Sequence, residues 1–122
     1  IKPVVSANAD HTYRLSRDAF QSRAAELSAC FHSRPWLAQP FMPQIVAEGE
    51  YSLFYLGGQY SHAVLKTPRR DDFRVQEEHG GAIMAVEPPP ALRAAGAAVM
   101  SALPEPTLYA RPDFVRDGGA WR

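Results

Sequence analysis

The sequence predicts an α+β protein with a largely antiparallel sheet and two main helices, and three observations support this. Gly57-Gly58 separates two alternating apolar runs, and a two-residue glycine turn of this kind joins antiparallel strands. Apolar residues recur at helical spacing in two other segments. Single strands, one hairpin and helices follow one another without repeated strand–helix units, which favours α+β over α/β.

The first third of the chain predicts two short strands, a helix and a third strand. Residues 1–5 and 12–15 alternate as strands do, and residues 6–10 between them are loop formers. A helix is expected over 17–31, with Ser16 or Asp18 as its cap. Its apolar stripe consists of Phe20, Ala24, Leu27 and Phe31. Pro35 ends the helix, and 36–41 is a short strand interrupted by Pro40.

The remainder predicts the hairpin, a charged loop, one more strand, the second helix and a final strand. The hairpin strands are 50–57 and 59–66, and the loop 67–81 carries six charges between Arg69 and Glu77. A strand at 82–86 precedes a helix that starts at the three prolines 88–90, because proline is tolerated in a first helical turn. The last strand is 107–115. After the turn 117–119, Trp121-Arg122 is too short to form a strand.

Composition excludes several classes of function. The 122 residues carry 13 basic and 13 acidic side chains, so no charge excess points to nucleic acid or an anionic membrane. No apolar run approaches the roughly 18 residues of a transmembrane helix. Cys30 is the only cysteine, which excludes an internal disulfide and fits the reducing cytoplasm. We expect it to be a small buried apolar residue without a histidine partner. The four histidines lack zinc-site spacing.

Several charged residues are candidates for a site, although each also fits a plain solvated surface. Lys2 at the end of a strand could reach phosphate oxygens as a point charge. Glu50 opens an alternating strand and could accept two ribose hydroxyls, with Glu48 as the competing carboxylate. Alternation places Arg111 and Asp113 on one strand face, where they could form an ion pair. On composition alone, the solvated interpretation is preferred.

A resemblance to a known family changes this preference. The segments that carry it are Gln39-Pro40-Phe41-Met42, Gly49-Glu50-Tyr51-Ser52-Leu53, Ser61-His62-Ala63-Val64 and Asp72-Phe73-Arg74-Val75-Gln76-Glu77-Glu78-His79-Gly80-Gly81. Taken in order, they resemble the ATP-grasp ligases, in particular the group of glutathione synthetase, the ribosomal-protein glutamate ligases and the D-cycloserine-forming ligase. Gln76 stands where that pattern has asparagine, so the amide is retained but displaced by one methylene.

The resemblance implies an ATP-dependent carboxylate–amine ligase that uses ATP and Mg²⁺ on an amino-acid-like small molecule. It implies that Lys2 and Lys66 contact phosphates and that Glu50 binds the ribose. Arg74 and Gln76 would act at the acyl phosphate. The adenine would lie against Gln39, Phe41 and Met42. Asp113 would be one Mg²⁺ ligand, and its partner carboxylates would follow beyond Arg122.

The same resemblance sets the expected domain organisation. Residues 1–122 would be a single domain, a truncated C-terminal half of the ATP-grasp region, without the N-terminal substrate domain and the last metal-binding strand. We expect this piece to be inactive alone and to associate as a homo-oligomer through an exposed sheet edge. The alternative is a non-catalytic α+β interaction module that contacts a protein through the charged loop 69–78.

Overall fold

The computed structural model describes residues 1–70 and 72–122, apart from the side chain of residue 78. Part of the predicted charged loop, at position 71, therefore lies outside the described residues. The chain divides into two compact units, Ile1–Phe41 and Met42–Arg122, which are considered in turn. The expectation that the whole chain forms one domain stays a prediction.

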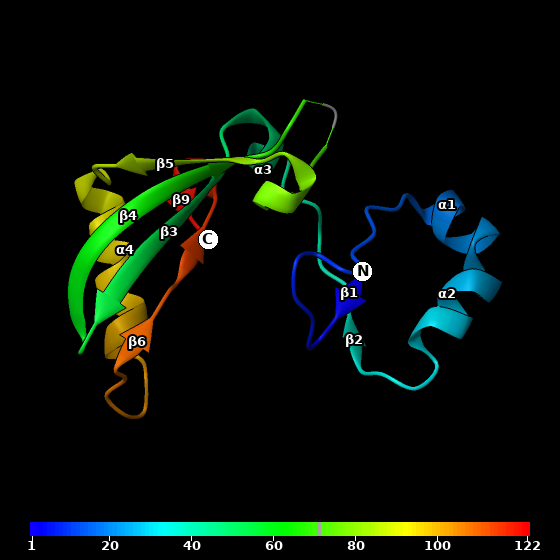
Figure 1. Cartoon of the computed structure of the whole chain (residues 1–122), viewed down its shortest axis with the longest axis horizontal. Coiled ribbons are helices and arrows are strands. Elements are labelled where there is room, and N and C mark those ends of the chain that lie inside the picture. The colour runs from blue at the N-terminus through cyan, green and yellow to red at the C-terminus, as the bar shows by residue number, and fades with distance from the viewer. Residues whose placement is uncertain (71) are drawn as a thin grey trace. The chain divides into compact units, whose positions relative to one another are not determined.

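The first unit contains two short helices and one small pair of strands (Figure 1). Strand β1 (Lys2–Pro3) pairs antiparallel with β2 (Trp36–Leu37). Helices α1 (Arg17–Ser22) and α2 (Ala24–Phe31) replace the single helix expected over 17–31. The chain leaves helical geometry at Arg23, where φ is −103° and ψ is 13°. The predicted cap is confirmed, since Ser16 accepts a hydrogen bond from the Ala19 N–H.

Two strand predictions in this unit are wrong or too long. Residues 12–15 form no strand; instead Tyr13 exchanges a pair of backbone hydrogen bonds with Ile1. The strand expected over 36–41 is limited to β2, because Pro40 cannot donate to a ladder. Leu27 and Phe31 are buried, whereas Phe20 in α1 is 42% exposed. The break at Arg23 thus divides the predicted apolar stripe.

The second unit is built on an antiparallel sheet with strand order β5-β4-β3-β6. The predicted hairpin is confirmed as β3 (Glu50–Leu56) and β4 (Gln59–Thr67). The outer strand β5 (Ala82–Val86) pairs with β4. The strand expected over 107–115 forms in two pieces, β6 (Tyr109–Ala110) and β7 (Asp113–Phe114), both paired with β3. Pro112 lies between them, where it has no N–H to donate.

The remaining elements are short, except for one helix. Helix α4 (Pro90–Ser101) confirms the prediction of a proline-initiated helix. Sequence reasoning missed α3 (Gln44–Ala47) and the short 3₁₀ helix η1 (Glu77–His79). It also wrongly excluded a strand at Trp121: β8 (Arg116–Asp117) pairs with β9 (Ala120–Trp121) across the turn. Within the described residues, no helix is long and apolar enough to cross a bilayer.

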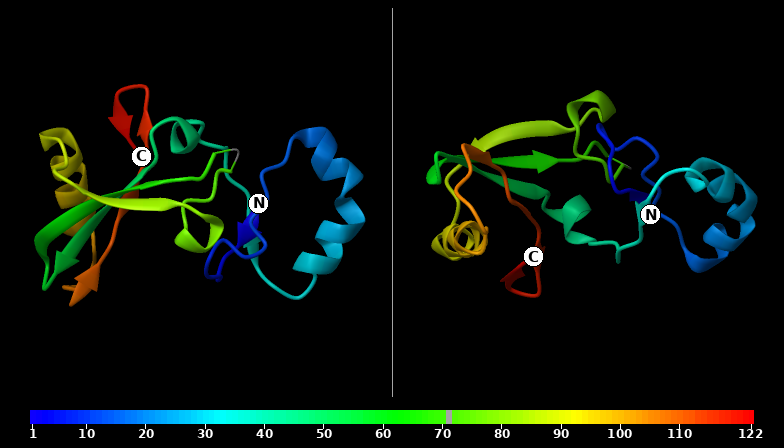
Figure 2. Two further views of the ribbon diagram at one scale, coloured as in Figure 1. Left: turned by 45° about the horizontal axis from the view of Figure 1, so that its top comes forward. Right: turned by 90° about the horizontal axis from the view of Figure 1, so that it is seen from below.

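Helix α4 runs along one face of the sheet, and the core of the unit lies between them (Figures 1 and 2). Leu53, Tyr55 and Leu92 are almost fully buried there. The packing is close at Gly96, where a Cβ atom would lie 2.5 Å from the Tyr55 hydroxyl and 2.7 Å from Leu53 Cδ2. Because successive strand residues point to opposite faces, Glu50, Ser52 and Phe54 project from the other face.

Candidate functional site

The sheet face opposite α4 brings together three of the predicted site residues. Glu50 on β3 lies directly opposite Lys66 on β4, and Ser52 lies opposite Asp113 on β7. Antiparallel register therefore places a lysine and two carboxylates side by side, although 63 residues of sequence separate Glu50 from Asp113. We refer to Glu50, Ser52, Lys66, Arg111 and Asp113 as the charged cluster.

Hydrogen bonds and ion pairs connect every member of the charged cluster. Lys66 Nζ lies 3.2 Å from Glu50 Oε1 and 3.7 Å from Asp113 Oδ1. The Ser52 hydroxyl donates to Asp113 Oδ1 at 2.5 Å. Arg111 donates from Nε and Nη2 to the two Asp113 oxygens, both at 3.0 Å. The Arg111–Asp113 ion pair, one of the alternatives left open by the sequence, is thus confirmed.

The cluster is partly removed from water, which strengthens its electrostatics. The Lys66 side chain is only 12% exposed, and Ser52 is fully buried. Burial would lower the pKa of Arg111, but its hydrogen bonds to Asp113 raise that pKa, so Arg111 stays cationic. Two cations and two carboxylates balance. An incoming phosphate or carboxylate could exchange with either carboxylate for the same donors.

Asp113 does not form a magnesium site with its described neighbours. Both of its oxygens already accept hydrogen bonds from Arg111, and Oδ1 also accepts from Ser52. No group of three or more His, Cys, Asp or Glu residues that could hold a metal occurs among the described residues. Because Mg²⁺ requires near-octahedral oxygen coordination, one engaged carboxylate does not fit it. The role of Asp113 as a metal ligand stays a prediction.

The competing carboxylate Glu48 has partners of its own. It accepts a hydrogen bond from the Tyr51 hydroxyl at 3.2 Å and pairs with Arg116 at 2.9 Å. Burial and this hydrogen bond both raise the pKa of Tyr51. Glu48 therefore belongs to a separate ion pair, and Glu50 is the carboxylate in the charged cluster. Ribose binding by Glu50 stays a prediction.

The structure ties Arg74 to its neighbour Asp72. Arg74 Nη2 lies 2.8 Å from Asp72 Oδ2, and the backbone N–H groups of Phe73 and Arg74 donate to Asp72 Oδ1. The Arg74 hydrogen bond holds the pKa of Asp72 well below its usual range. This turn orders the segment around Arg74, but an anionic ligand would have to compete with Asp72 for the guanidinium.

Gln76 and the following glycines form a compact turn. The Gln76 carbonyl accepts hydrogen bonds from the N–H groups of His79 and Gly81. A Cβ atom on Gly81 would lie 2.3 Å from the Val75 carbonyl oxygen, so backbone packing alone requires glycine there. Gln76 Oε1 is buried without a hydrogen-bond partner among the described residues. An orphan buried acceptor is costly, which makes this amide a candidate ligand contact.

Four predicted residues precede the charged cluster in the sequence. Lys2, Gln39 and Phe41 belong to the first unit, and Met42 is the first residue of the second. Lys2 is half-buried in β1. Gln39 is exposed, and the Phe41 ring lies 3.8 Å from the Arg14 guanidinium carbon. Gln39, Phe41 and Met42 lie outside the strands and helices, whereas Lys2 belongs to β1. The proposed adenine and phosphate contacts of these four residues stay predictions.

Sequence reasoning missed one cysteine contact. Cys30 Sγ lies 3.2 Å from His11 Nδ1 and 3.9 Å from the Tyr13 hydroxyl, and Cys30 is only half-buried. The expectations of a buried apolar cysteine and of no Cys–His pair are therefore wrong. His11 reaches the thiol from a loop in which its φ is 53°, and no periodic pattern reveals such a loop contact.

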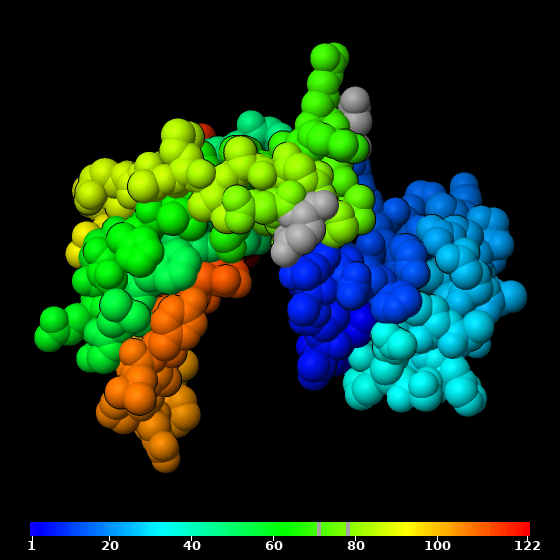
Figure 3. Space-filling model, viewed as in Figure 1, coloured from blue at the N-terminus to red at the C-terminus, as the bar shows by residue number. Residues whose placement is uncertain are grey.

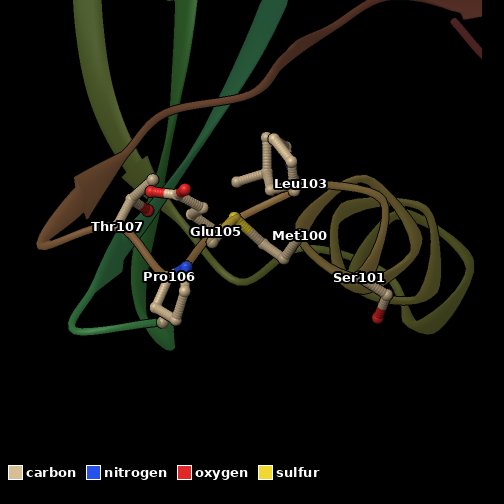
Figure 4. Close-up of a pocket in the computed structure, with 8 residues that line it drawn as sticks. Met100, Ser101, Leu103, Glu105, Pro106 and Thr107 are labelled. Atoms are coloured by element: carbon tan, nitrogen blue, oxygen red, sulfur yellow. The ribbon is translucent and has the colours of Figure 1, made fainter.

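A pocket of about 320 Å³ lies apart from all of these residues (Figure 4). It is formed by the end of α4, the following loop and the tip of the β3–β4 hairpin. Its lining is mixed, with the apolar Met100, Leu103 and Pro106 beside the polar Ser101, Glu105 and Thr107. It contains none of the predicted site residues, so it gives no support to their assignment.

Comparison with known proteins identifies the fold. No protein-family model and no curated protein matches the chain. The solved structure of D-cycloserine synthetase DcsG is similar, with a TM-score of 0.76 at 22% sequence identity. The chain has an ATP-grasp-like fold. The match covers 98% of this chain but only 43% of the other, so the chain spans less than half of the protein it resembles. The expected truncated ATP-grasp half fits this match.

Proposed function

We propose that this chain is the ATP-binding portion of a carboxylate–amine ligase. The observation that carries the proposal is the charged cluster on the sheet face opposite α4, here called the open face, of an ATP-grasp-like sheet. Lys66 supplies a partly desolvated ammonium, and Arg111 adds a second cation fixed by Asp113. Preorganised cations in a water-poor site are what anionic oxygens of a nucleotide and an acyl phosphate require.

The proposed reaction has two balanced steps. A substrate carboxylate oxygen attacks the γ-phosphorus of ATP, so that ADP leaves and an acyl phosphate forms. The neutral substrate amine then attacks the acyl carbon, the C–O bond to phosphate breaks, the nitrogen loses a proton to the departing phosphate or to water, and an amide and inorganic phosphate result. Lys66 and Lys2 hold phosphate oxygens, Glu50 holds the ribose, and Arg74 with Gln76 contacts the acyl phosphate. Adenine lies against Gln39, Phe41 and Met42.

Mg²⁺ belongs to the proposal as the ion that accompanies ATP. The described residues supply it with Asp113 at most, so no step is assigned to it. We further propose that the chain alone does not turn over, because it spans less than half of the ligase structure that it resembles. Carboxylate-dependent release of phosphate from ATP by the purified chain would contradict this second proposal.

The first test is titration calorimetry of ATP into the chain and into Lys66→Ala. Loss of one charge-assisted contact costs about 1.5–3 kcal/mol, so we expect affinity to fall at least about tenfold. Arg93→Ala is the matched control. It also removes one positive charge, but from α4, which lies on the opposite face of the sheet. Equal affinities of the native chain and Lys66→Ala would contradict the role of Lys66.

The interaction-module alternative has less support. Arg69 and Arg70 are exposed, but Asp72 and Arg74 satisfy each other and Val75 is only 3% exposed. Much of the described loop is thus packed rather than available to a partner. Absence of any ATP binding by a chain that is folded by circular dichroism would reverse this preference.

A further inference from the structure

The open face of the sheet carries three cross-strand rows of different chemistry. The first row is Glu50 opposite Lys66, the charged end. The second row is Ser52 opposite Val64, which in turn lies opposite Ala85 on β5. The third row is Phe54 opposite His62, with Tyr109 beside Phe54 at a ring distance of 6.3 Å. We refer to these as the charged, small and aromatic rows.

The small row separates two rows of taller side chains. Adjacent rows are two residues apart along each strand, which corresponds to about 6.6 Å. Asp113, beside Ser52, and Arg111 extend the charged cluster toward the aromatic row along the neighbouring strand segment. A molecule whose anionic group met Lys66 or Arg111 would therefore lie next to the small side chains of Val64 and Ala85.

The aromatic row is ordered but unused by the core. The Phe54 and His62 rings stack with centroids 4.4 Å apart and an angle of 9° between their planes. His62 is exposed, and Tyr109 is 54% exposed. The core of this unit instead uses residues on the opposite face, such as Tyr55. Phe54 is half-buried beside these two exposed rings, and such an aromatic group on the face that carries the charged cluster points to a bound molecule.

A β-bulge at Ser61 sets up this arrangement. The register of β3 and β4 shifts between Phe54 and Tyr55, so that Tyr55 lies opposite Tyr60 rather than Ser61. Tyr60 thereby stays with the core, where it packs against Tyr55, while His62 remains on the open face. Ser61 Oγ lies 3.0 Å from His62 Nδ1 and fixes the ring. Bulges of this kind re-aim side chains beside binding sites.

From these observations we infer that Phe54, His62 and Tyr109 are specificity-determining residues that bind a planar, π-bearing side chain of the carboxylate substrate. This inference rests on the proposed ligase function and adds a substrate class to it. The substrate carboxylate lies toward Arg111, whose place in the register is beside Phe54, and its planar group contacts the aromatic row. Edge-to-face and offset stacking on the ordered rings favour a flat ring over a branched aliphatic group.

The test measures amino-acid binding and ATP binding separately, by calorimetry on the 122-residue chain. The probes are L-phenylalanine and L-leucine, which share the charged groups and differ in the planar ring. We expect phenylalanine to bind about five- to tenfold more tightly, the advantage that one aromatic contact provides. In His62→Leu and Tyr109→Leu the preference falls to within about twofold. Both positions are exposed, so folding is preserved; Phe20→Leu, in the other unit, keeps the preference.

Two results would overturn the assignment of the aromatic row to the substrate side chain. One is failure of phenylalanine to bind; the other is an equal preference for phenylalanine over leucine in His62→Leu and in the native chain. If adenosine binds and these same variants weaken it, the aromatic row holds the nucleotide base and the inference is also overturned. A native chain that prefers phenylalanine but binds no ATP supports the aromatic subsite and rejects the proposed ligase function, so the two failures are distinguishable.

Discussion

The Ser52 hydroxyl is expected to contribute measurably to the stability of the charged cluster. Ser52 is fully buried and donates to the Asp113 carboxylate. A hydrogen bond to a charged group contributes about 1.5–3 kcal/mol. Asp113 keeps its two bonds from Arg111 in Ser52→Ala, so we expect the lower end of that range. The free energy of unfolding should therefore fall by about 1.5 kcal/mol.

Urea denaturation of the native chain, Ser52→Ala, Asp113→Asn and the double variant measures this contribution. The double-mutant cycle isolates the pair, because Ser52→Ala removes the donor and Asp113→Asn removes the charge of the acceptor. We expect a coupling free energy of about 1 kcal/mol or more. Ser101→Ala is the matched control: Ser101 is exposed, and its hydroxyl donates to the Ala97 carbonyl within the same helix. Additive effects of Ser52→Ala and Asp113→Asn would refute the reasoning.

Three further predictions follow from the second unit. In Gly96→Ala, overpacking against Tyr55 costs about 1–3 kcal/mol and outweighs the gain in helix propensity of about 1 kcal/mol; a higher melting temperature would contradict the observed contact. The lowered pKa of Asp72 means that its contribution to stability is complete above the ordinary value of 3.8 and is lost as pH falls below it. Acid titration of Asp72→Asn should thus show a shallower loss of stability below pH 4 than the native chain, and identical curves would disprove the assignment. In Met84→Lys, a charge on the outer strand β5 blocks edge pairing, so light scattering should show less self-association than in the native chain; a native chain that stays monomeric on concentration would remove the basis of this prediction.

The edge prediction depends on how β5 presents itself. Ile83 and Met84 are 47% and 58% exposed, and β5 lies at the outside of the second unit (Figure 3). The segment 82–86 contains no charged residue, so self-pairing would place no like charges opposite each other. This agrees with the expected homo-oligomer, which stays a prediction.

Elements with a strong local signal were predicted well from the sequence. The glycine pair specified the β3–β4 hairpin, and the proline triplet specified the start of α4. The sequence predicts one helix over 17–31 that includes Arg23, because the apolar stripe of Phe20 and Leu27 continues across the break and the segment contains no glycine or proline. A single residue that leaves helical geometry has no periodic signature, so pattern reasoning could not find it.

The charged cluster contains three of the residues named from the sequence, Glu50, Lys66 and Asp113, but the contacts among them could not be predicted. Alternation placed Arg111 and Asp113 on one face, and this pair is present. Ser52 went unnoticed as a functional residue because its importance comes from lying opposite Asp113, a contact between residues 61 positions apart. Its position two residues after Glu50 on an alternating strand was the available signal.

The balance of charges in the cluster bears on how a nucleotide would bind. Lys66 and Arg111 are both paired with Asp113, which lies 31% exposed between them. A phosphate that binds these cations would leave Asp113 with only Ser52 as its partner, and an unpaired, partly desolvated carboxylate is costly. A cation arriving with the phosphate would remove that cost by taking the place of Arg111 beside Asp113. The pairing of Asp113 with Arg111 in the free chain therefore predicts that ATP binding and cation binding are mutually dependent.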